Sequence, residues 1–333
     1  MIIILIISTF SIVAVDSETG EVGIAVASKV FDVGYIVPWL EAEYGGVASQ
    51  AYANPFLGPW ILSSLSRGKP AGEALRIALS RDTMPEVRQV GVVDRHGYSA
   101  AHTGRDCLAW AGHRTGRWVS VQGNILTGPE VVDSMFAVFI RTKGPLAERL
   151  LAALEAGDRA GGDRRGRQSA ALYVVRKRGG YQGADDRLVD LKVVDNPEPI
   201  KELRRLYDSW QYTFLAAAYL RLANEEGKDV FLRRARKLAE TALVSTLKDP
   251  YLYNNLAWEF ALKRIYPDLT LKLAHRAHEL APEDANIMDT MAEAYYAAGN
   301  WRMAIHWEKK ALEKEPENEF FKKQLRRFEE GGK

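Results

Sequence analysis

Hydrophobic and polar residues alternate near the start of the chain in a pattern that predicts two short strands. Residues 9–16 read TFSIVAVD and residues 21–29 read EVGIAVASK, and both segments are rich in β-branched side chains. The SETG sequence between them contains residue types that form tight turns. We therefore predict an antiparallel hairpin in which Asp16 faces Glu21, so that the numbers of paired residues sum to 37.

This register places Ser28 opposite Thr9, the first residue of the first strand. A shift of one residue would place Ala27 or Lys29 there instead, because side chains alternate between the two faces of a strand. In each case we expect the end of the second strand to bring Ser28 and Lys29 beside the hydroxyl of Thr9.

Similar patterns continue to residue 194. Alternating runs predict further strands at residues 45–53, 89–94, 98–103, 118–122, 168–176 and 186–194. Helical periodicity, with prolines at several helix starts, predicts helices at residues 60–66, 71–81, 130–141 and 146–156. Strands at both ends with two helix pairs between them are typical of a layered α+β sandwich.

From residue 199 onward only helical patterns occur, and internal repeats appear. Prolines at positions 250, 282 and 316 lie 32 and 34 residues apart, close to the tetratricopeptide (TPR) period of about 34 residues. The segment MAEAYYAAGNWRMAIHWEKKALEKEP resembles that repeat. Glu308 lies where the repeat usually has an aromatic residue, with Trp307 next to it. We expect an all-α, TPR-like helical repeat domain over residues 209–330.

The composition limits the classes of protein to consider. The 333 residues suffice for two domains, and 47% hydrophobic with 26% charged residues is typical of globular proteins. The net charge of +2 favours neither a nucleic acid nor a membrane surface as a partner. No run reaches the roughly 18 apolar residues of a membrane span, so the expected location is cytoplasmic. The one cysteine, Cys107, excludes an intrachain disulfide and a multi-cysteine metal site.

Thr9 raises a question of chemistry. As the first residue of a mature chain, a threonine carries both a nucleophilic hydroxyl and an α-amine that can act as its base. Such an amine has a pKa of roughly 7.7–8.0, so part of it is neutral near pH 7. The ammonium of Lys29 would favour the neutral amine. The alternative is an ordinary threonine in a buried strand.

Four segments of the chain resemble a domain-of-unknown-function family, the one numbered 1028. They are TFSIVAVDSETGEVGIAVASK, QVGVVD with AAHTG, VSVQGN, and GGDRRGRQSAAL. The resemblance covers about residues 9–208, and that family is similar in fold to the N-terminal-nucleophile (Ntn) hydrolases. It implies a four-layer αββα sandwich, with two antiparallel sheets between helix layers.

Family members typically begin Met-Thr-Phe-Ser-Ile-Val, so that removal of Met exposes the threonine. In this sequence residues 1–8 precede Thr9. Either these residues are a propeptide that must be cut, or the start of the chain is assigned too early.

Other polar residues near predicted strand ends are candidates for the same site. Asn124 follows Gln122 and a glycine, where an amide can donate to an oxyanion; a polar turn is the alternative. Gln50, Asn54 and His102 follow or end strands and are candidates for lining the cleft. His102 is alternatively a hydrogen-bonded residue of the core or pocket wall.

The segment DRRGRQS, residues 163–169, is the densest polar motif of the chain. Arg164 and Arg167 have the fork geometry that binds a carboxylate or phosphate of a substrate. Asp163 could equally hold the loop in place through these arginines. No combination of histidines and carboxylates has the spacing of a metal site, and no nucleotide-binding motif occurs, so we expect neither a metal nor a cofactor.

Two functional hypotheses follow. The first is an Ntn-type amidohydrolase that cleaves a small amide or acyl substrate, with Thr9 as nucleophile, Lys29 tuning the amine and Asn124 binding the oxyanion. The expected substrate-binding residues are Ser28, Gln50, Asn54, His102, Gln122, Asp163, Arg164 and Arg167. The second is a non-catalytic scaffold that binds a protein or peptide partner on its helical repeats. Assembly into a homo-oligomer is also considered.

Overall fold

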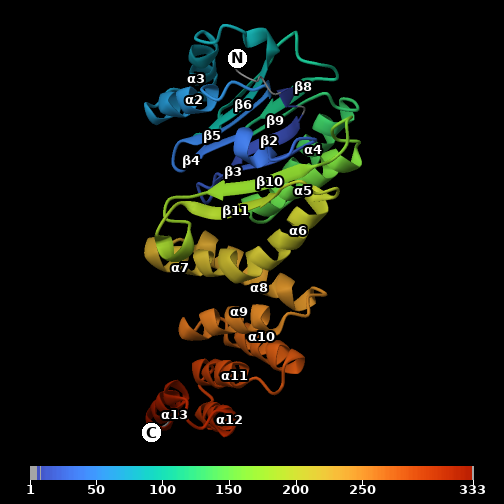
Figure 1. The fold of residues 1–333 in the computed structure, drawn as a ribbon. Coiled ribbons are helices and arrows are strands. Elements are labelled where there is room, and N and C mark those ends of the chain that lie inside the picture. Colours follow the sequence, from blue (N-terminus) through green and yellow to red (C-terminus); the bar gives the residue numbers. More distant parts are fainter. Residues whose placement is uncertain (1–5, 8, 332–333) are drawn as a thin grey trace. The chain divides into compact units, whose positions relative to one another are not determined.

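The computed structural model of the chain describes residues 6–7 and 9–331. It contains two compact units, Met1–Tyr207 and Asp208–Lys333 (Figure 1). The first unit contains the β-strands, which form two sheets. The second unit is helical.

Both sheets of the first unit are antiparallel. In the first sheet the strand order is β1-β5-β6-β7, and β4 also pairs with β5. Its strands are β1 (Ile6–Ile7), β4 (Pro38–Glu41), β5 (Gly45–Tyr52), β6 (Arg88–Asp94) and β7 (Ser99–Thr103). The order in the second sheet is β11-β10-β3-β2-β9-β8. Its strands are β2 (Thr9–Val15), β3 (Val22–Ser28), β8 (Gly112–Gly116), β9 (Val119–Asn124), β10 (Ser169–Val175) and β11 (Arg187–Val193).

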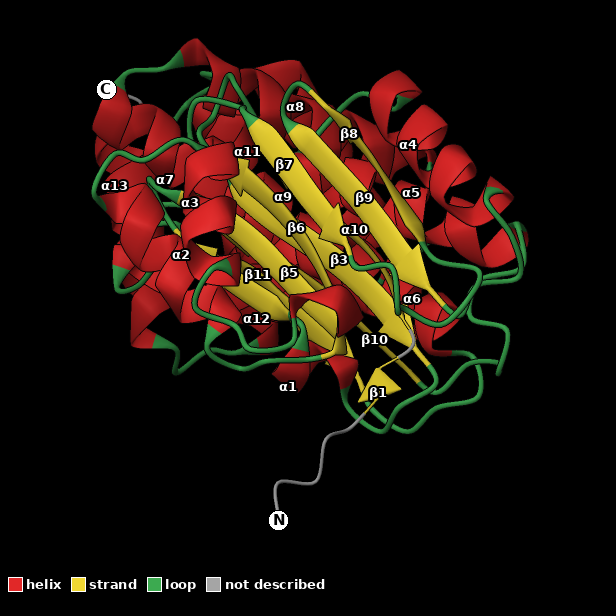
Figure 2. Ribbon diagram, turned by 90° about the horizontal axis from the view of Figure 1, so that it is seen from above, coloured by secondary structure: helices red, strands yellow, loops and turns green. Residues whose placement is uncertain are grey.

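The two sheets pack face to face, and each outer face is covered by a pair of helices. α2 (Leu57–Ser66) and α3 (Ala71–Leu79) lie on the first sheet, and α4 (Glu130–Arg141) and α5 (Leu146–Arg159) lie on the second (Figure 2). Between the sheets, the inward-facing residues of β2 and β3 pack against Ala48 and Val93. The layer order is therefore helix, sheet, sheet, helix. The first unit also contains α1 (Val33–Ile36) and the short 3-10 helices η1 (Pro85–Val87) and η2 (Tyr181–Gly183).

The first hairpin has the register that its sequence predicts. β2 and β3 pair from Phe10 opposite Ala27 to Val15 opposite Val22, so the paired residue numbers sum to 37. The amide of Asp16 donates to the carbonyl of Glu21 at 2.9 Å, which closes the turn. Residues 31–44, for which the sequence predicted neither a helix nor a strand, contain α1 and β4, and β8 is a further strand that was not predicted.

The first unit ends within α6 (Pro199–Trp210). Arg204 on this helix forms ion pairs with Glu148 at 2.7 Å and with Glu155 at 2.8 Å, both on α5. These pairs hold α6 to the helix layer of the second sheet.

The second unit contains seven α-helices among the residues that the structure describes. After the π-helical segment η3 (Gln211–Leu215) come α7 (Ala216–Glu226), α8 (Asp229–Val244), α9 (Pro250–Leu262), α10 (Pro267–Leu280), α11 (Ala285–Ala297), α12 (Trp301–Lys314) and α13 (Glu319–Gly331). The side chains of Asp249, Asp284 and Asn318 accept hydrogen bonds from amides in the first turns of α9, α11 and α13, which satisfies otherwise unpaired donors at these helix starts.

The helical unit buries a cluster of carboxyl groups where α11, α12 and α13 meet. Asp289 and Glu293 lie on α11, and Glu308 on α12 has no exposed surface. On α13, Arg327 forms an ion pair with Glu293, and Gln324 donates to Glu293 at 3.3 Å. This cluster contains more carboxyl groups than basic groups, and the excess of negative charge affects the protonation of the carboxyls.

Across residues 6–7 and 9–331, no helix has the length and apolar character needed to cross a membrane.

Candidate functional site

Polar side chains gather at one end of the sandwich, in a row across each sheet. In the second sheet, Ser169 lies opposite Ser28, and Thr9 lies opposite Asn124. The hairpin register places Ser28 beside Thr9. In the first sheet, Gln50 lies opposite Gln89, which lies opposite Thr103. Because the sheets stack, these two rows face each other.

Hydrogen bonds join the two rows through Gln89, a residue with no exposed surface. The side-chain carbonyl of Gln89 accepts from Asn124 Nδ2 at 3.1 Å and from Gln50 Nε2 at 2.8 Å. Gln50 Nε2 also lies 3.3 Å from the main-chain carbonyl of Thr9. Gln89 therefore fixes the direction in which the amide of Asn124 faces, beside the start of β2.

A second set of hydrogen bonds lies deeper between the sheets. Ser11 donates to Gln50 Oε1 at 2.7 Å and accepts from Gln122 Nε2 at 2.7 Å. The opposing position on β6 is Gly91, where an added Cβ would lie only 1.9 Å from Gln122 Oε1. A glycine is therefore required there for the sheets to approach. Gln122, one of the expected substrate-binding residues, is fully buried. It lies deeper between the sheets and holds Ser11 in place through its hydrogen bond.

Toward β7 and β8, the hydrogen bonds of Gln89 extend to a histidine. Gln89 Nε2 donates to Thr103 Oγ1 at 3.0 Å, and Thr103 Oγ1 lies 2.8 Å from Nδ1 of His113. Burial lowers the pKa of His113, and the neighbouring His102 lowers it further, so the imidazole is neutral near pH 7. His102 itself lies 2.8 Å from the carbonyl of Pro85 in η1, directly before β6.

Thr9 is buried, with no exposed surface. It shares a strand face with Ser11, two residues along, and Ser11 contacts Gln50 of the first sheet. The side chain of Thr9 therefore faces the space between the sheets. Before it in sequence, Ile6–Ile7 form β1, which pairs with the end of β5 in the first sheet.

The glycine- and arginine-rich loop after α5 is anchored by Asp163. Its carboxylate accepts from the amide of Lys29 at 2.9 Å and forms an ion pair with Arg165 at 3.0 Å. The ammonium of Lys29 donates to the carbonyl of Arg167 at 3.1 Å. Lys29 and Asp163 together hold this loop against the end of β3.

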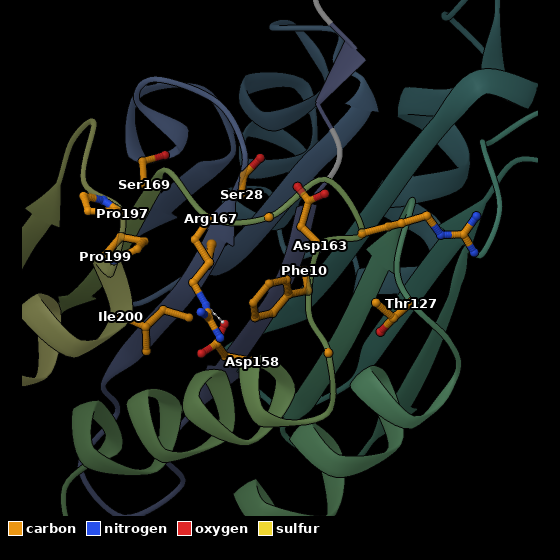
Figure 3. A pocket seen from close by; sticks show the side chains of 14 residues that line it. Phe10, Ser28, Thr127, Asp158, Asp163, Arg167, Ser169, Pro197, Pro199 and Ile200 are labelled. Carbon is orange, nitrogen blue, oxygen red and sulfur yellow. Dashed lines mark hydrogen bonds and ion pairs between the residues drawn. The ribbon is translucent and has the colours of Figure 1, made fainter.

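A pocket of about 370 Å³ opens beside this loop. Its lining includes Phe10, Ser28, Asp163, Arg164, Arg167 and Ser169. Figure 3 shows the guanidinium of Arg167 turned toward Asp158, and the two groups are 2.6 Å apart. Hydrogen bonding to Asp158 raises the pKa of Arg167, which keeps this arginine charged. Arg164 is exposed at the pocket.

The pocket and the side chain of Thr9 lie on opposite faces of β2. Phe10 lines the pocket, and Thr9 is not among its lining residues; adjacent residues of a strand point to opposite faces. Ser28 and Ser169 end and begin their strands at this same end of the sandwich. The pocket therefore lies beside the two rows of polar side chains and does not surround the side chain of Thr9.

Asn54, expected to line the cleft, is held in a structural cluster. Its Nδ2 donates to Asp82 at 2.7 Å, and its Oδ1 accepts from the amide of Phe56. Asp82 also receives two hydrogen bonds from Arg88, whose Nη1 donates to the carbonyl of Tyr52. Burial acts to raise the pKa of Asp82, but hydrogen bonds from Arg88 and Asn54 hold it below its ordinary value. The cluster fixes the end of β5.

Sequence reasoning missed Gln89, Ser11 and Thr103, although it selected their partners Gln50, Gln122 and Asn124. In the sequence, Gln89 is recognisable as a polar residue that starts an otherwise apolar predicted strand, residues 89–94. No group of three or more histidine, cysteine or acidic side chains within residues 6–7 and 9–331 could hold a metal ion.

Residues 9–203 match the family described as "Family of unknown function (DUF1028)", which is the family that the four sequence segments indicated. The crystal structure of protein SPO2555 from Silicibacter pomeroyi, which carries the same family name, is similar with a TM-score of 0.56 and 32% sequence identity. That match covers 61% of this chain and 89% of the other.

A search of curated proteins finds no match. The family match spans more than half of the 333 residues. The chain therefore belongs to the family of unknown function DUF1028.

Proposed function

We propose that the first unit is an Ntn-type hydrolase that cleaves an amide bond with Thr9 as its nucleophile, after residues 1–8 have been removed. The observation that carries this proposal is the position of Thr9. It begins β2 opposite Asn124, at the end of the sandwich where both sheets bring polar side chains together. The helix–sheet–sheet–helix layering supports the same class of fold.

In the proposed reaction the free amine of Thr9 accepts the hydroxyl proton through a water molecule. Oγ1 bonds to the carbonyl carbon of the substrate, and the negative oxygen that forms is stabilised by Asn124 Nδ2 and main-chain amides. The carbon–nitrogen bond then breaks, and the leaving amine takes up the proton. Water hydrolyses the resulting ester, which releases an acid and restores Thr9.

The surrounding residues have supporting roles in this proposal. Gln89 orients Asn124 through its hydrogen bond of 3.1 Å. Lys29 contributes a positive charge that favours the neutral amine, and its contacts with Asp163 and Arg167 place it at the end of β3. Arg164 is exposed at the neighbouring pocket and is the proposed contact for an anionic group of the substrate.

Removal of residues 1–8 follows the same chemistry. The hydroxyl of Thr9 attacks the carbonyl carbon of the preceding residue, the peptide bond becomes an ester, and water hydrolyses that ester. The products are the free leader and a chain with an α-amine at Thr9. In this first reaction the proton acceptor is a water molecule, because the amine is still part of the peptide bond.

The test combines the mass of the mature chain with labelling by an electrophilic amide mimic. We expect N-terminal sequencing to begin at Thr9 and the probe to attach there. Thr9→Ala should abolish labelling, whereas Thr9→Ser should retain it because serine also has a hydroxyl. Thr115→Ala, at an exposed threonine on β8, is the matched control. Undiminished labelling of Thr9→Ala, or a mature chain that keeps residues 1–8, would refute the proposal.

The helical unit supports a second function, the binding of a protein or peptide partner by TPR-like repeats. The capped starts of α9, α11 and α13 are 35 and 34 residues apart, and stacked repeats of this length form extended binding surfaces. A chain that keeps its leader and fails to react with the probe, yet binds a partner through residues 250–331, would favour this function alone.

A further inference from the structure

The edge of β5 next to Thr9 is a backbone-pairing site, and β1 occupies it. β1 runs antiparallel to β5, with Ile6 opposite Tyr52 and Ile7 opposite Ala51, at the end of the sandwich where β3 and β9 finish (Figure 2). Thr9 belongs to β2 in the other sheet. The segment before Thr9 therefore extends one sheet, while Thr9 itself lies in the other.

The part of this edge that β1 covers is short and defined. Residues 45–48 of β5 pair with β4 along the same edge, and the amide of Ser49 donates to the carbonyl of Val37 at 3.1 Å. Main-chain groups alternate between the two edges of a strand, so the amide of Ala51 faces β1. The other edge of β5 is paired with β6, where Ala51 lies opposite Arg88.

We propose that this edge of β5, at Ala51 and Tyr52, binds the acyl side of an extended peptide substrate by adding it as a strand. The inference rests on the function proposed for Thr9. In that reaction residues 1–8 are the acyl part of the first bond to be cut, and Ile6–Ile7 occupy the edge. Their departure exposes unpaired main-chain groups, which readily accept another strand.

A second peptide can then take the same place, with its scissile carbonyl beside Thr9. The chemical class of substrate is a peptide whose main chain is extended over the two or three residues before the cut. Main-chain hydrogen bonds supply affinity in this mode of recognition. A small free amide has no such groups and gains nothing from the edge of β5. The two leader residues that pair with this edge, Ile6 and Ile7, are apolar, so we expect apolar residues in such a peptide.

The direct test is binding of the leader in trans. A fluorescent peptide with the sequence KKILIIS is titrated into a chain that begins at position 9 and carries Thr9→Ala, so that no turnover occurs. The full chain with Thr9→Ala is the control, since its own leader occupies the edge. We expect binding to the shortened chain to be at least about tenfold tighter, which corresponds to the gain from one or two main-chain hydrogen bonds.

Methylation of single peptide nitrogens distinguishes strand pairing from nonspecific hydrophobic binding. The amide of Ala51 faces the residue opposite it, which is Ile7. In such a pair the peptide nitrogen of Ile7 also faces β5, and a methyl group on it would hold the two strands apart. N-methylation at the peptide residue equivalent to Ile7 should weaken binding about tenfold or more, whereas N-methylation at the equivalent of Ile6, whose nitrogen faces away from β5, should change it little. Equal effects at both positions, or equal binding to the full and shortened chains, would overturn the proposal.

Folding of the shortened chain is checked by circular dichroism. If it does not fold, the full chain with Thr9→Ala and Ile7→Pro replaces it, because proline removes the amide of residue 7 and disrupts β1. This variant should bind the peptide, and failure to do so overturns the proposal. Peptide binding without labelling of Thr9 refutes the hydrolase and leaves a peptide-binding edge. Labelling of Thr9 without strand pairing refutes only the substrate class.

Discussion

Replacing the buried Glu308 by glutamine should weaken a strong pH dependence in the stability of the helical unit. Glu308 and Asp289 face each other between α11 and α12, away from water. Burial is the main cause that raises the pKa of Glu308, and the negative charge of Asp289 and its hydrogen bond with Glu308 raise it further. Burial likewise raises the pKa of Asp289. One proton is therefore held by this pair near neutral pH.

The sign of the effect follows from proton binding. A carboxyl whose pKa is raised in the folded state binds a proton that the unfolded chain releases above its ordinary pKa of about 4.3. The free energy of unfolding of this region therefore falls as the pH rises above that value, by about 1.4 kcal/mol per pH unit for one full proton. Between about pH 5.5 and about pH 7.5 the loss from one such proton is at most about 2.7 kcal/mol, and the buried Asp289, whose pKa is raised to about 7, adds to it in the lower part of this range.

Hydrogen–deuterium exchange of peptides from residues 285–331 measures this quantity, after correction for the intrinsic pH dependence of exchange. We expect the opening free energy of α11 and α12 to decrease with pH in the wild type. Glu308→Gln should make this decrease shallower, leaving the part that comes from the buried Asp289, and should raise the opening free energy at neutral pH. Glu313→Gln, an exposed position on the same helix, should retain the wild-type slope. A wild type without slope, or a Glu308→Gln variant with the full wild-type slope, would show that Glu308 does not hold this proton.

Three further outcomes are expected in the first unit. Gly91→Ala should destabilise this unit by about 1–3 kcal/mol in urea denaturation, because the added Cβ would lie 1.9 Å from Gln122 Oε1. Gly72→Ala, which has open space around the added Cβ, should not destabilise it. Equal effects of the two substitutions would contradict the close approach of the sheets. Arg88→Met should cost about 3–5 kcal/mol by leaving the carboxylate of Asp82 without its cation, and a loss below about 1 kcal/mol would contradict that pairing. The pKa of Asp82 is lowered in the folded state, so its carboxylate stabilises the fold above its ordinary pKa, and this stabilisation is lost on acidification. Thermal denaturation of Arg88→Met should therefore show a smaller loss of stability on acidification than the wild type.

The strands and the first hairpin could be predicted because their determinants are local. Alternation in residues 9–16 and 21–29 and the tight turn between them specify both strands and their register, and the structure has the same register. Among the elements missed, α1 and β4 lie in a segment whose pattern is irregular. β4 has partly exposed positions and pairs with only four residues of β5. Its pairing depends on a partner strand that follows it, rather than on its own sequence.

The candidate site was less predictable because its contacts join distant parts of the chain. Gln50 and Asn124 are visible in the sequence as polar residues near strand ends, but Gln89 gains its importance only when the two sheets stack. Asn54 looks similar to them in sequence, yet a carboxylate 28 residues later takes its amide. Among the arginines of the 163–167 loop, the spacing alone did not indicate that Arg165 pairs with Asp163.

The bridge formed by Arg204 affects where the first unit can be cut. The family match ends at residue 203, one position before the guanidinium that joins Glu148 and Glu155. A fragment ending there would leave two partly buried carboxylates two helical turns apart without their shared cation, and would also lack the buried ring of Tyr207. The family match therefore ends before the residues that complete the contact of α6 with α5, and a stable fragment of the first unit should extend at least to residue 207.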